Sequence, residues 1–437
     1  MLKEQMRIVF RSAFTAAIFA AASIVASLVG CGAAPVSTVT ASNQPPMSKP
    51  TVAAIYFPSW HVDDHYSSWY GEGWNEYRLL AENPERFPGH HRIQPAKDWG
   101  YFDEADPKWM ARQIDQAAQF GVDVFIFDWY WYSGVQILHR PVEEALPKTP
   151  NRDKIKYALM WANHPWIDYF PVKYEGEPNW LFRARHSTAD FDRVIQHCIE
   201  RHFNQPNYWR VNGGAYFSLF IPEDLMTQVG GPQQCKAMLT AAREKVRKAG
   251  LGEVHFAGFT GNHGNDERSI PNLEAAGFDS VTGYNLNPMS ADDHKLPERP
   301  FEEYDHLVER HEELWDRMST GNLPYAPVVT VGWDATARWE KGVPWPPTKN
   351  AYPYSPTAIN NTPEKFGGLV RRGLRQMEEA KVRPPFLLIN AWNEWTEGDS
   401  LLPQEKYGNG YLEELKKALA AGPLPRETTT APAPRAD

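Results

Sequence analysis

Short apolar runs alternate with longer amphipathic stretches between about residues 51 and 420. The runs are rich in β-branched, aliphatic and aromatic residues, as β-strands are. They cover residues 52–57, 124–127, 157–161, 215–220, 254–259, 280–284, 327–331 and 386–390. Several of them are apolar at every position, which is typical of strands buried on both faces of a parallel sheet.

The stretches between these runs carry the start and stop signals of helices. Asp106-Pro107 supplies an N-cap and a first helical residue, and Gly121 ends the same helix. Thr362-Pro363 begins a second helix and Gly250 ends a third. Further helices are expected at residues 189–202, 301–318 and 410–420.

Alternation of strands with helices predicts an α/β fold, specifically a single (β/α)8 TIM barrel with enlarged βα loops. A doubly wound open sheet is the alternative architecture. It is disfavoured because no glycine-rich fingerprint follows the first strand, at residues 52–57.

The N-terminal region has the pattern of a bacterial lipoprotein signal. Three basic residues precede an apolar stretch that ends in LVGC at residues 28–31. We expect cleavage of residues 1–30 and lipidation of Cys31, which would anchor the protein in the cell envelope, at the outer membrane or the periplasmic face. An uncleaved anchor is the alternative. Residues 31–50 are expected to form a flexible tether, residues 51–421 the catalytic domain and residues 422–437 a disordered tail.

Composition restricts the classes of partner. With 42% hydrophobic and 23% charged residues, the 437-residue chain is neither disordered nor fibrous. Its formal net charge of −9 argues against nucleic acid as a partner. Neither the GxSxG elbow of serine hydrolases nor a GxxxxGK[ST] phosphate loop occurs. We expect the protein to be a monomer without a cofactor. Cys198 and Cys235 do not have the spacing of metal ligands. They could form a disulfide or remain two buried free thiols.

Histidines near the predicted loops do not form a recognisable metal motif. None has the HExxH spacing or a carboxylate at another fixed ligand offset, so we expect no metal site. The histidines concerned are His61, His65, His90, His91, His164 and His263.

Polar and aromatic residues cluster where the predicted strands end, and the active sites of (β/α)8 barrels are built from those ends. Aromatic rings pack against the C–H faces of sugars, and polar side chains bind the hydroxyl groups. The pattern therefore predicts a cleft for a polysaccharide or oligosaccharide, with loop capping as the structural alternative for the two aspartates. The candidate binding residues are Trp60, His61, Asp128, Trp129, Tyr130, Asn163, His164, Tyr284, Trp333, Asp334, Trp392, Asn393 and Trp395.

Two glutamates follow the last predicted strand and are the candidate catalytic residues. Glu394 and Glu397 lie three residues apart in a turn, where their side chains can share a face. Two neighbouring carboxyl groups shift each other's pKa apart, which leaves one protonated and one ionised near neutral pH. Such a pair can cleave an acetal by general acid and base catalysis. Two glutamates on a solvated turn are the structural alternative.

Several longer motifs resemble the WbsX-like, glycoside hydrolase family 99-like domain, from about residue 52 to residue 419. They are AIYFPSWH, WYGEGWNEY, FPGHH, DWGYFD, FDWYWYSG, WANH, LLINAWNEWTEG, LLP and KYGNGYLEEL. The resemblance implies a (β/α)8 fold and an endo-acting, retaining activity on α-mannosides. It implies that Glu394 assists attack by the sugar 2-hydroxyl, which gives a 1,2-anhydro sugar, and that Glu397 is the acid and then the base. Thr396 departs from the family pattern, which commonly has His at that position.

These observations favour an envelope-anchored glycoside hydrolase. A glycosyltransferase or transglycosylase of surface polysaccharide assembly is the second hypothesis, but export would separate a transferase from cytoplasmic sugar nucleotides. A non-catalytic glycan-binding lipoprotein is the third.

Overall fold

The computed structural model describes residues 50–177, 179–260, 267–288, 300–347, 352–379 and 385–425. The signal and tether at residues 1–49 lie outside these ranges, as do His263 and residues 426–437. Cleavage and lipidation at Cys31 therefore stay predictions. Within the described ranges, none of the helices combines the length and the apolar character needed to cross a membrane.

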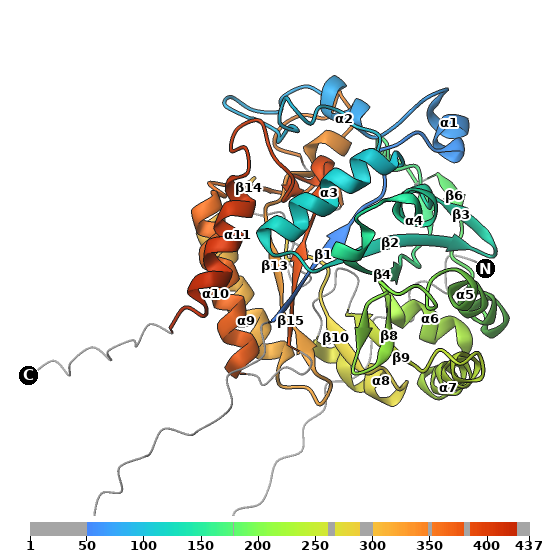
Figure 1. Ribbon diagram of the computed structural model, residues 1–437. Coiled ribbons are helices and arrows are strands. Elements are labelled where there is room, and N and C mark those ends of the chain that lie inside the picture. Colours follow the sequence, from blue (N-terminus) through green and yellow to red (C-terminus); the bar gives the residue numbers. More distant parts are fainter. Residues whose placement is uncertain are drawn as a thin grey trace, which may run out of the picture. The chain divides into compact units, whose positions relative to one another are not determined.

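Parallel strands form a closed barrel (Figure 1). In spatial order they are β12 (Tyr325–Ala326), β10 (Ser280–Thr282), β9 (Glu253–Phe259), β8 (Gly214–Leu219), β4 (Lys156–Trp161), β2 (Val124–Tyr132), β1 (Thr51–Tyr56), β15 (Phe386–Asn390) and β13 (Val328–Thr330). Pro327 alone separates β12 from β13, so the two pieces act as one strand that pairs with β10 on one side and β15 on the other. This closure confirms the predicted (β/α)8 barrel.

Helices cover the outside of the barrel (Figure 1). The longer ones are α3 (Pro107–Phe120), α5 (Thr188–Arg201), α6 (Pro222–Val229), α7 (Pro232–Lys248), α9 (Tyr304–Met318), α10 (Pro363–Glu379) and α11 (Gly410–Ala421). Apolar residues of these helices pack on the strands, which are themselves almost wholly buried. β2, for example, is buried at every position, and its first four residues are the apolar run predicted at residues 124–127.

Short elements occupy the connections, many of them after the carboxyl ends of the barrel strands. The helical ones are α1 (Asp64–Tyr70), α2 (Tyr77–Glu82), η2 (Pro141–Ala145), α4 (Leu146–Lys148), η3 (Arg152–Lys154), η4 (Glu267–Ser269), α8 (Ile270–Ala275), η5 (Ala335–Arg338) and η6 (Trp395–Glu397). The short strands are β3 (Val135–Ile137), β5 (Trp166–Ile167), β6 (Trp180–Phe182), β7 (Arg210–Val211), β11 (Phe301–Glu303), β14 (Thr357–Ile359), β16 (Asn393–Glu394) and β17 (Asp399–Ser400).

The sequence signals for α3 act as predicted. The Asp106 carboxylate accepts a hydrogen bond from the Lys108 backbone N–H, and Pro107 is the first helical residue. Gly121 ends the helix with φ of +93°, and a Cβ atom there would lie 2.9 Å from a methyl group of Leu419. The left-handed backbone conformation therefore favours glycine at this position.

Two expectations about the chain need adjustment, and one open question is decided. The helix expected at residues 301–318 begins only at Tyr304, because residues 301–303 form β11 and pair with β14. Residues 422–425 belong to the predicted disordered tail, yet the Leu424 N–H donates to the Arg371 carbonyl of α10. Cys198 and Cys235 are buried free thiols, which decides the question that the sequence left open.

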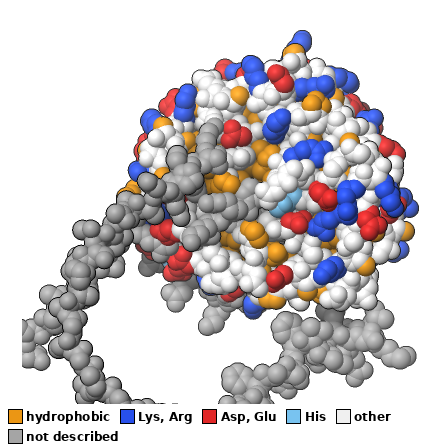
Figure 2. All heavy atoms as spheres, turned by 60° about the horizontal axis from the view of Figure 1, so that its bottom comes forward, with side chains coloured by type: hydrophobic (Ala, Val, Ile, Leu, Met, Phe, Trp, Pro, Cys, Tyr) orange, Lys and Arg blue, Asp and Glu red, His pale blue; other side chains and the backbone are white. Residues whose placement is uncertain are grey.

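Charged groups of both signs are interspersed on the face of the molecule shown in Figure 2. The described side chains visible on that face form no broad basic field of the kind that binds nucleic acid.

Candidate active site

A cavity of about 320 Å³ lies at the carboxyl ends of the barrel strands. Such a volume suits one or two sugar rings, since small-molecule sites commonly measure about 300–1,000 Å³. Its wall combines aromatic rings with four charged side chains. The lining residues are Phe57, Asp128, Tyr130, Met160, Ala162, His164, Trp166, Tyr169, Phe170, Phe220, Ile221, Tyr284, Asn285, Asn287, Trp333, Arg338, Tyr352, Glu394 and Glu397.

The segment after β15 folds so that both predicted catalytic glutamates reach this cavity. The Asn393 side chain fixes its start by accepting from the Phe57 N–H and donating to the Phe57 carbonyl, each at 2.8 Å. β16 then pairs with β17, and η6 turns the chain back. Gly398 ends η6 with φ of +70°, and a Cβ atom there would lie 2.6 Å from the Asp334 backbone nitrogen. The final glycine of WNEWTEG is therefore required by backbone geometry.

Arg338 holds the two glutamates together. Its Nη2 donates to Glu394 Oε2 at 3.1 Å, and its Nη1 donates to Glu397 Oε1. The guanidinium lies over the rings of Phe57 and Phe170, at 5.3 and 5.5 Å from their centres. Both glutamates and the arginine are nearly inaccessible to solvent. One buried cation thus fixes the orientation of two buried carboxylates.

A third carboxylate, that of Glu76, lies behind the arginine. Glu76 Oε1 accepts from Arg338 Nη2 at 2.8 Å and from Arg338 Nε at 3.1 Å. The hydroxyl of Thr396 also donates to Glu76 and lies 3.0 Å from Arg338 Nε. Thr396, the residue that departs from the family pattern, therefore belongs to the support of Arg338 and does not line the cavity.

Two tyrosines complete the hydrogen bonds of the glutamate pair. The Tyr284 hydroxyl lies 3.2 Å from Glu394 Oε1 and 2.9 Å from Asp128 Oδ2, and the Tyr352 hydroxyl donates to Glu397 Oε1 at 2.8 Å. The other Asp128 oxygen, Oδ1, is buried and has no hydrogen-bond partner among the described residues. Asp128 lines the cavity, although its Oδ1 atom itself has almost no accessible surface.

Burial and neighbouring charges raise the pKa of the acidic groups here. Burial raises the pKa of Glu394 well above its ordinary value, and the Glu397 charge adds to the rise while Arg338 opposes it. Burial also raises the pKa of Glu397, while Arg338 and the Tyr352 hydrogen bond oppose that rise. Burial also raises the pKa of Asp128 well above its ordinary value. The site can therefore hold a protonated and an ionised carboxyl group together near neutral pH.

Aromatic residues form a further part of the cavity wall. Trp166 begins the β5–β6 hairpin and packs edge-on against Tyr130, with ring centres 4.9 Å apart. His164 stacks on Trp166, and burial lowers its pKa, which keeps its imidazole neutral at pH 7. This wall offers ring faces and a neutral hydrogen-bonding group, the combination expected for a sugar ring.

The structure thus brings seven of the sequence-predicted residues to one cavity. They are Asp128, Tyr130, His164, Tyr284, Trp333, Glu394 and Glu397.

The other predicted binding residues do not line this cavity, which corrects the expectation that most strand-end tryptophans face it. Trp60, Trp392 and Trp395 are buried in the hydrophobic core, and Trp392 Nε1 donates to Gln113 at 3.0 Å. Trp129 follows Asp128 in β2 and points to the opposite side of the strand, where its Nε1 lies 3.3 Å from Glu143 Oε1. Asp128 and Trp129 differ because successive side chains of one strand point to opposite faces.

The remaining predicted residues hold loops in place. His61 Nδ1 lies 3.2 Å from Glu104, and Asn163 bridges the backbone N–H and carbonyl of Ile221. Asn393 bridges Phe57, as described above. Asp334 accepts from the Thr336 N–H and lies 2.7 Å from His90 Nε2. These contacts fit the structural alternative, in which Asp334 caps a loop.

Sequence patterns missed the group that organises the site, Arg338, together with Glu76 and Tyr352. Arg338 ends η5, four residues after the strand-end aspartate Asp334, and a charged residue there resembles any polar loop residue. Glu76 lies between aromatic residues in the segment GWNEY, which was a usable signal that this charge is buried.

A (β/α)8 barrel with paired carboxylates in an aromatic cavity has the features of a carbohydrate site. A family model also matches the chain. Residues 52–415 match the model described as Glycosyltransferase WbsX, so the chain belongs to that family. Two proteins named Uncharacterized protein WxcX, from strains of Xanthomonas campestris pv. campestris, are each 26% identical over 85% of this chain. The match covers 50% of each relative, so the chain spans about half of their length.

Solved structures share the fold. The GH99 endo-alpha-mannosidase from Bacteroides thetaiotaomicron is 15% identical, with a TM-score of 0.52 over 86% of this chain and 98% of that one. A glycoside hydrolase-like protein is 16% identical, with a TM-score of 0.54 over 87% of this chain and 97% of that one. At these identities the likeness is one of fold. Together with the family match, it confirms the resemblance seen in the sequence motifs.

Proposed function

We propose that the protein is a glycoside hydrolase that cleaves a polysaccharide internally and with retention of configuration, using Glu394 and Glu397. The observation that carries this proposal is the convergence of both carboxylates on one buried arginine at the wall of a sugar-sized cavity. Raised carboxyl pKa values supply a proton donor next to an ionised base, as acetal cleavage requires. The Asp128 side chain and the aromatic wall, which line the cavity, are the groups that would hold the sugar.

Within the pair, we assign the acid and base roles by family resemblance. Glu394 would activate the 2-hydroxyl of the sugar, and Glu397 would protonate the leaving oxygen. α-Mannosides are the first substrates to try, because their 2-hydroxyl lies trans to the leaving group.

We further propose that the protein acts in the bacterial envelope, held by a lipid on Cys31. The LVGC sequence at residues 28–31 supports this location. Its substrate would then be an envelope or external polysaccharide.

Release of reducing ends from a polysaccharide panel tests the proposal. The parent protein should act on at least one glycan, first of all mannans. Glu394→Gln and Glu397→Gln should each lose about 10²-fold or more, within the range that general acid–base groups contribute. Glu82→Gln is the matched control, because Glu82 is an exposed glutamate on α2. Equal activity in all four proteins would overturn the proposal.

Substrates with activated aryl leaving groups separate the two roles, because they need little protonation. They should restore the first release of the aryl group in the variant that lacks the acid and not in the variant that lacks the base that assists the 2-hydroxyl. Restoration of Glu397→Gln supports the family assignment, whereas restoration of Glu394→Gln reverses it.

Glycosyl transfer is the second candidate function, because the matching family model is described as a glycosyltransferase. Chain-lengthened products from a nucleotide-sugar or lipid-linked donor would establish it. Tight oligosaccharide binding without any product would instead indicate a glycan-binding protein.

A further inference from the structure

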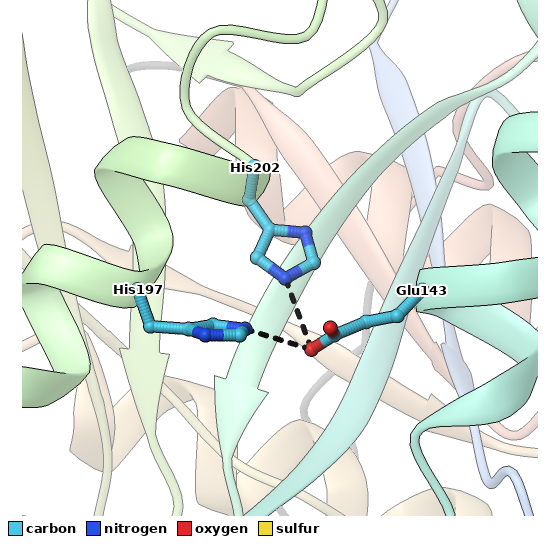
Figure 3. Close-up of side chains that lie close together, drawn as sticks. All are labelled: Glu143, His197 and His202. Carbon is cyan, nitrogen blue, oxygen red and sulfur yellow. Dashed lines mark hydrogen bonds and ion pairs between the residues drawn. The ribbon is translucent and has the colours of Figure 1, made fainter.

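A second cluster of ionisable side chains lies on the outer side of β2, away from the cavity. It contains Glu143 from η2 together with His197 and His202 at the C-terminal end of α5 (Figure 3). Among the described residues, it is the one group of three or more histidine, cysteine or acidic side chains whose possible ligand atoms lie within 4.8 Å of one another.

The distances within the cluster suit a transition-metal ion. Both imidazole Nε2 atoms point at Glu143 Oε1, from 2.9 Å for His197 and 3.4 Å for His202 (Figure 3). Ligands about 2.0–2.2 Å from a tetrahedral zinc ion lie about 3.3 Å from one another. The two histidine–glutamate separations bracket that value, and all three ligand atoms lie within 4.8 Å of one another, so small side-chain movements would admit an ion.

Further hydrogen bonds orient the three side chains. His202 Nδ1 lies 3.2 Å from the Tyr157 hydroxyl, a contact that directs the other ring nitrogen toward Glu143. Glu143 Oε1 also accepts from Gln136 at 2.5 Å and from Trp129 at 3.3 Å. Metal-binding histidines and carboxylates are commonly held by outer contacts of this kind.

We propose that Glu143, His197 and His202 bind one divalent transition-metal ion of the zinc class. Two imidazoles and one carboxylate are ligands that zinc prefers, and solvent can supply the fourth because the His197 side chain is 19% exposed. Arg201 Nε lies 3.9 Å from the second carboxylate oxygen, but its side chain is 57% exposed and can turn into solvent.

The ion would have a structural role. It would tie the loop after β3 to the end of α5, directly behind Trp129. Trp129 is the neighbour in β2 of Asp128, whose carboxylate accepts from Tyr284 in the cavity. Fixing Trp129 would therefore help to fix that strand end. This proposal does not depend on the proposed glycoside hydrolase activity.

Zinc binding by the untagged full-length protein tests the proposal. After chelation and dialysis, the protein is loaded with zinc, and the retained metal is measured by mass spectrometry. We expect one equivalent in the parent and less than a tenth of that in His197→Ala and in Glu143→Gln. His306→Ala is the matched control, because His306 pairs with Glu302 at 3.0 Å outside the cluster, and it should retain one equivalent.

A cobalt spectrum of the parent protein makes the test independent of how the variants fold. Four-coordinate cobalt with nitrogen and oxygen ligands absorbs far more strongly in the visible range than the six-coordinate aqueous ion. Strong absorption that zinc displaces would support the site. Failure of the parent to retain either ion, or equal retention by folded His197→Ala, would show a hydrogen-bonded network only and overturn the proposal.

Discussion

Replacing Arg338 with methionine should destabilise the protein in a pH-dependent way. The substitution keeps much of the side-chain volume but removes the cation from among the buried carboxylates of Glu76, Glu394 and Glu397. Removing one partner of a buried ion network typically costs about 3–5 kcal/mol, because the remaining charge is uncompensated. We expect a loss of that size in the free energy of unfolding at pH 8.

The pH dependence follows from the raised pKa values of the glutamate pair. A carboxyl group whose pKa is higher in the folded than in the unfolded protein favours folding at low pH, and that stability is lost as pH rises through the folded pKa. Arg338 holds the pKa of both groups down, so its removal raises them further. The loss of stability should therefore be smaller at pH 5, where more of these groups are protonated, than at pH 8.

Urea denaturation at the two pH values measures this loss. Arg317→Met is the matched control, since Arg317 forms an exposed ion pair with Glu267 at 3.5 Å. Exposed pairs contribute about 0–1 kcal/mol, so the control should show little loss at either pH. A loss below about 1 kcal/mol for Arg338→Met at pH 8, or equal losses at both pH values, would refute this account of the site.

Three further predictions concern single side chains. Tyr284→Phe removes a hydroxyl shared by two buried carboxylates and should lower the free energy of unfolding by about 1–3 kcal/mol, measured in urea; no loss would mean that the hydroxyl does not bridge them. Trp392→Ala should cost about 3–5 kcal/mol, because Trp392 is a core residue, while oligosaccharide affinity of the folded fraction should stay unchanged in calorimetry. Cys198 and Cys235 should react with a thiol reagent only after unfolding, and rapid reaction of the native protein would contradict their burial.

Much of the fold was predictable because its signals are local. The caps of α3 and the continuous apolar sequence of β2 indicate a buried parallel strand beside a helix without any knowledge of the rest. β11 was missed because residues 301–303 become a strand only by pairing with β14, more than 50 residues later in the chain. The hydrophobic periodicity of residues 301–303 gives no information about a pairing strand so far along the chain.

The candidate site divides in the same way. Glu394 and Glu397 were predictable because they adjoin the last strand in one motif. Trp129 and Trp392 were expected to face the cavity but do not. The sequence at a strand end does not show where the alternation of side chains between the two faces stops and the loop begins. Arg338 and Glu76 lie more than 250 residues apart, and their pairing arises only when the loops after different strands converge.

The anomer formed first by the parent protein tests the central claim most directly. Proton NMR, recorded during cleavage of a polysaccharide found in the panel, identifies that anomer before it equilibrates. We predict the configuration of the original bond, and its formation should cease in Glu394→Gln and in Glu397→Gln. Release of the inverted anomer, or the same retained product from either folded variant at the parent rate, would contradict the claim that this glutamate pair cleaves the glycosidic bond.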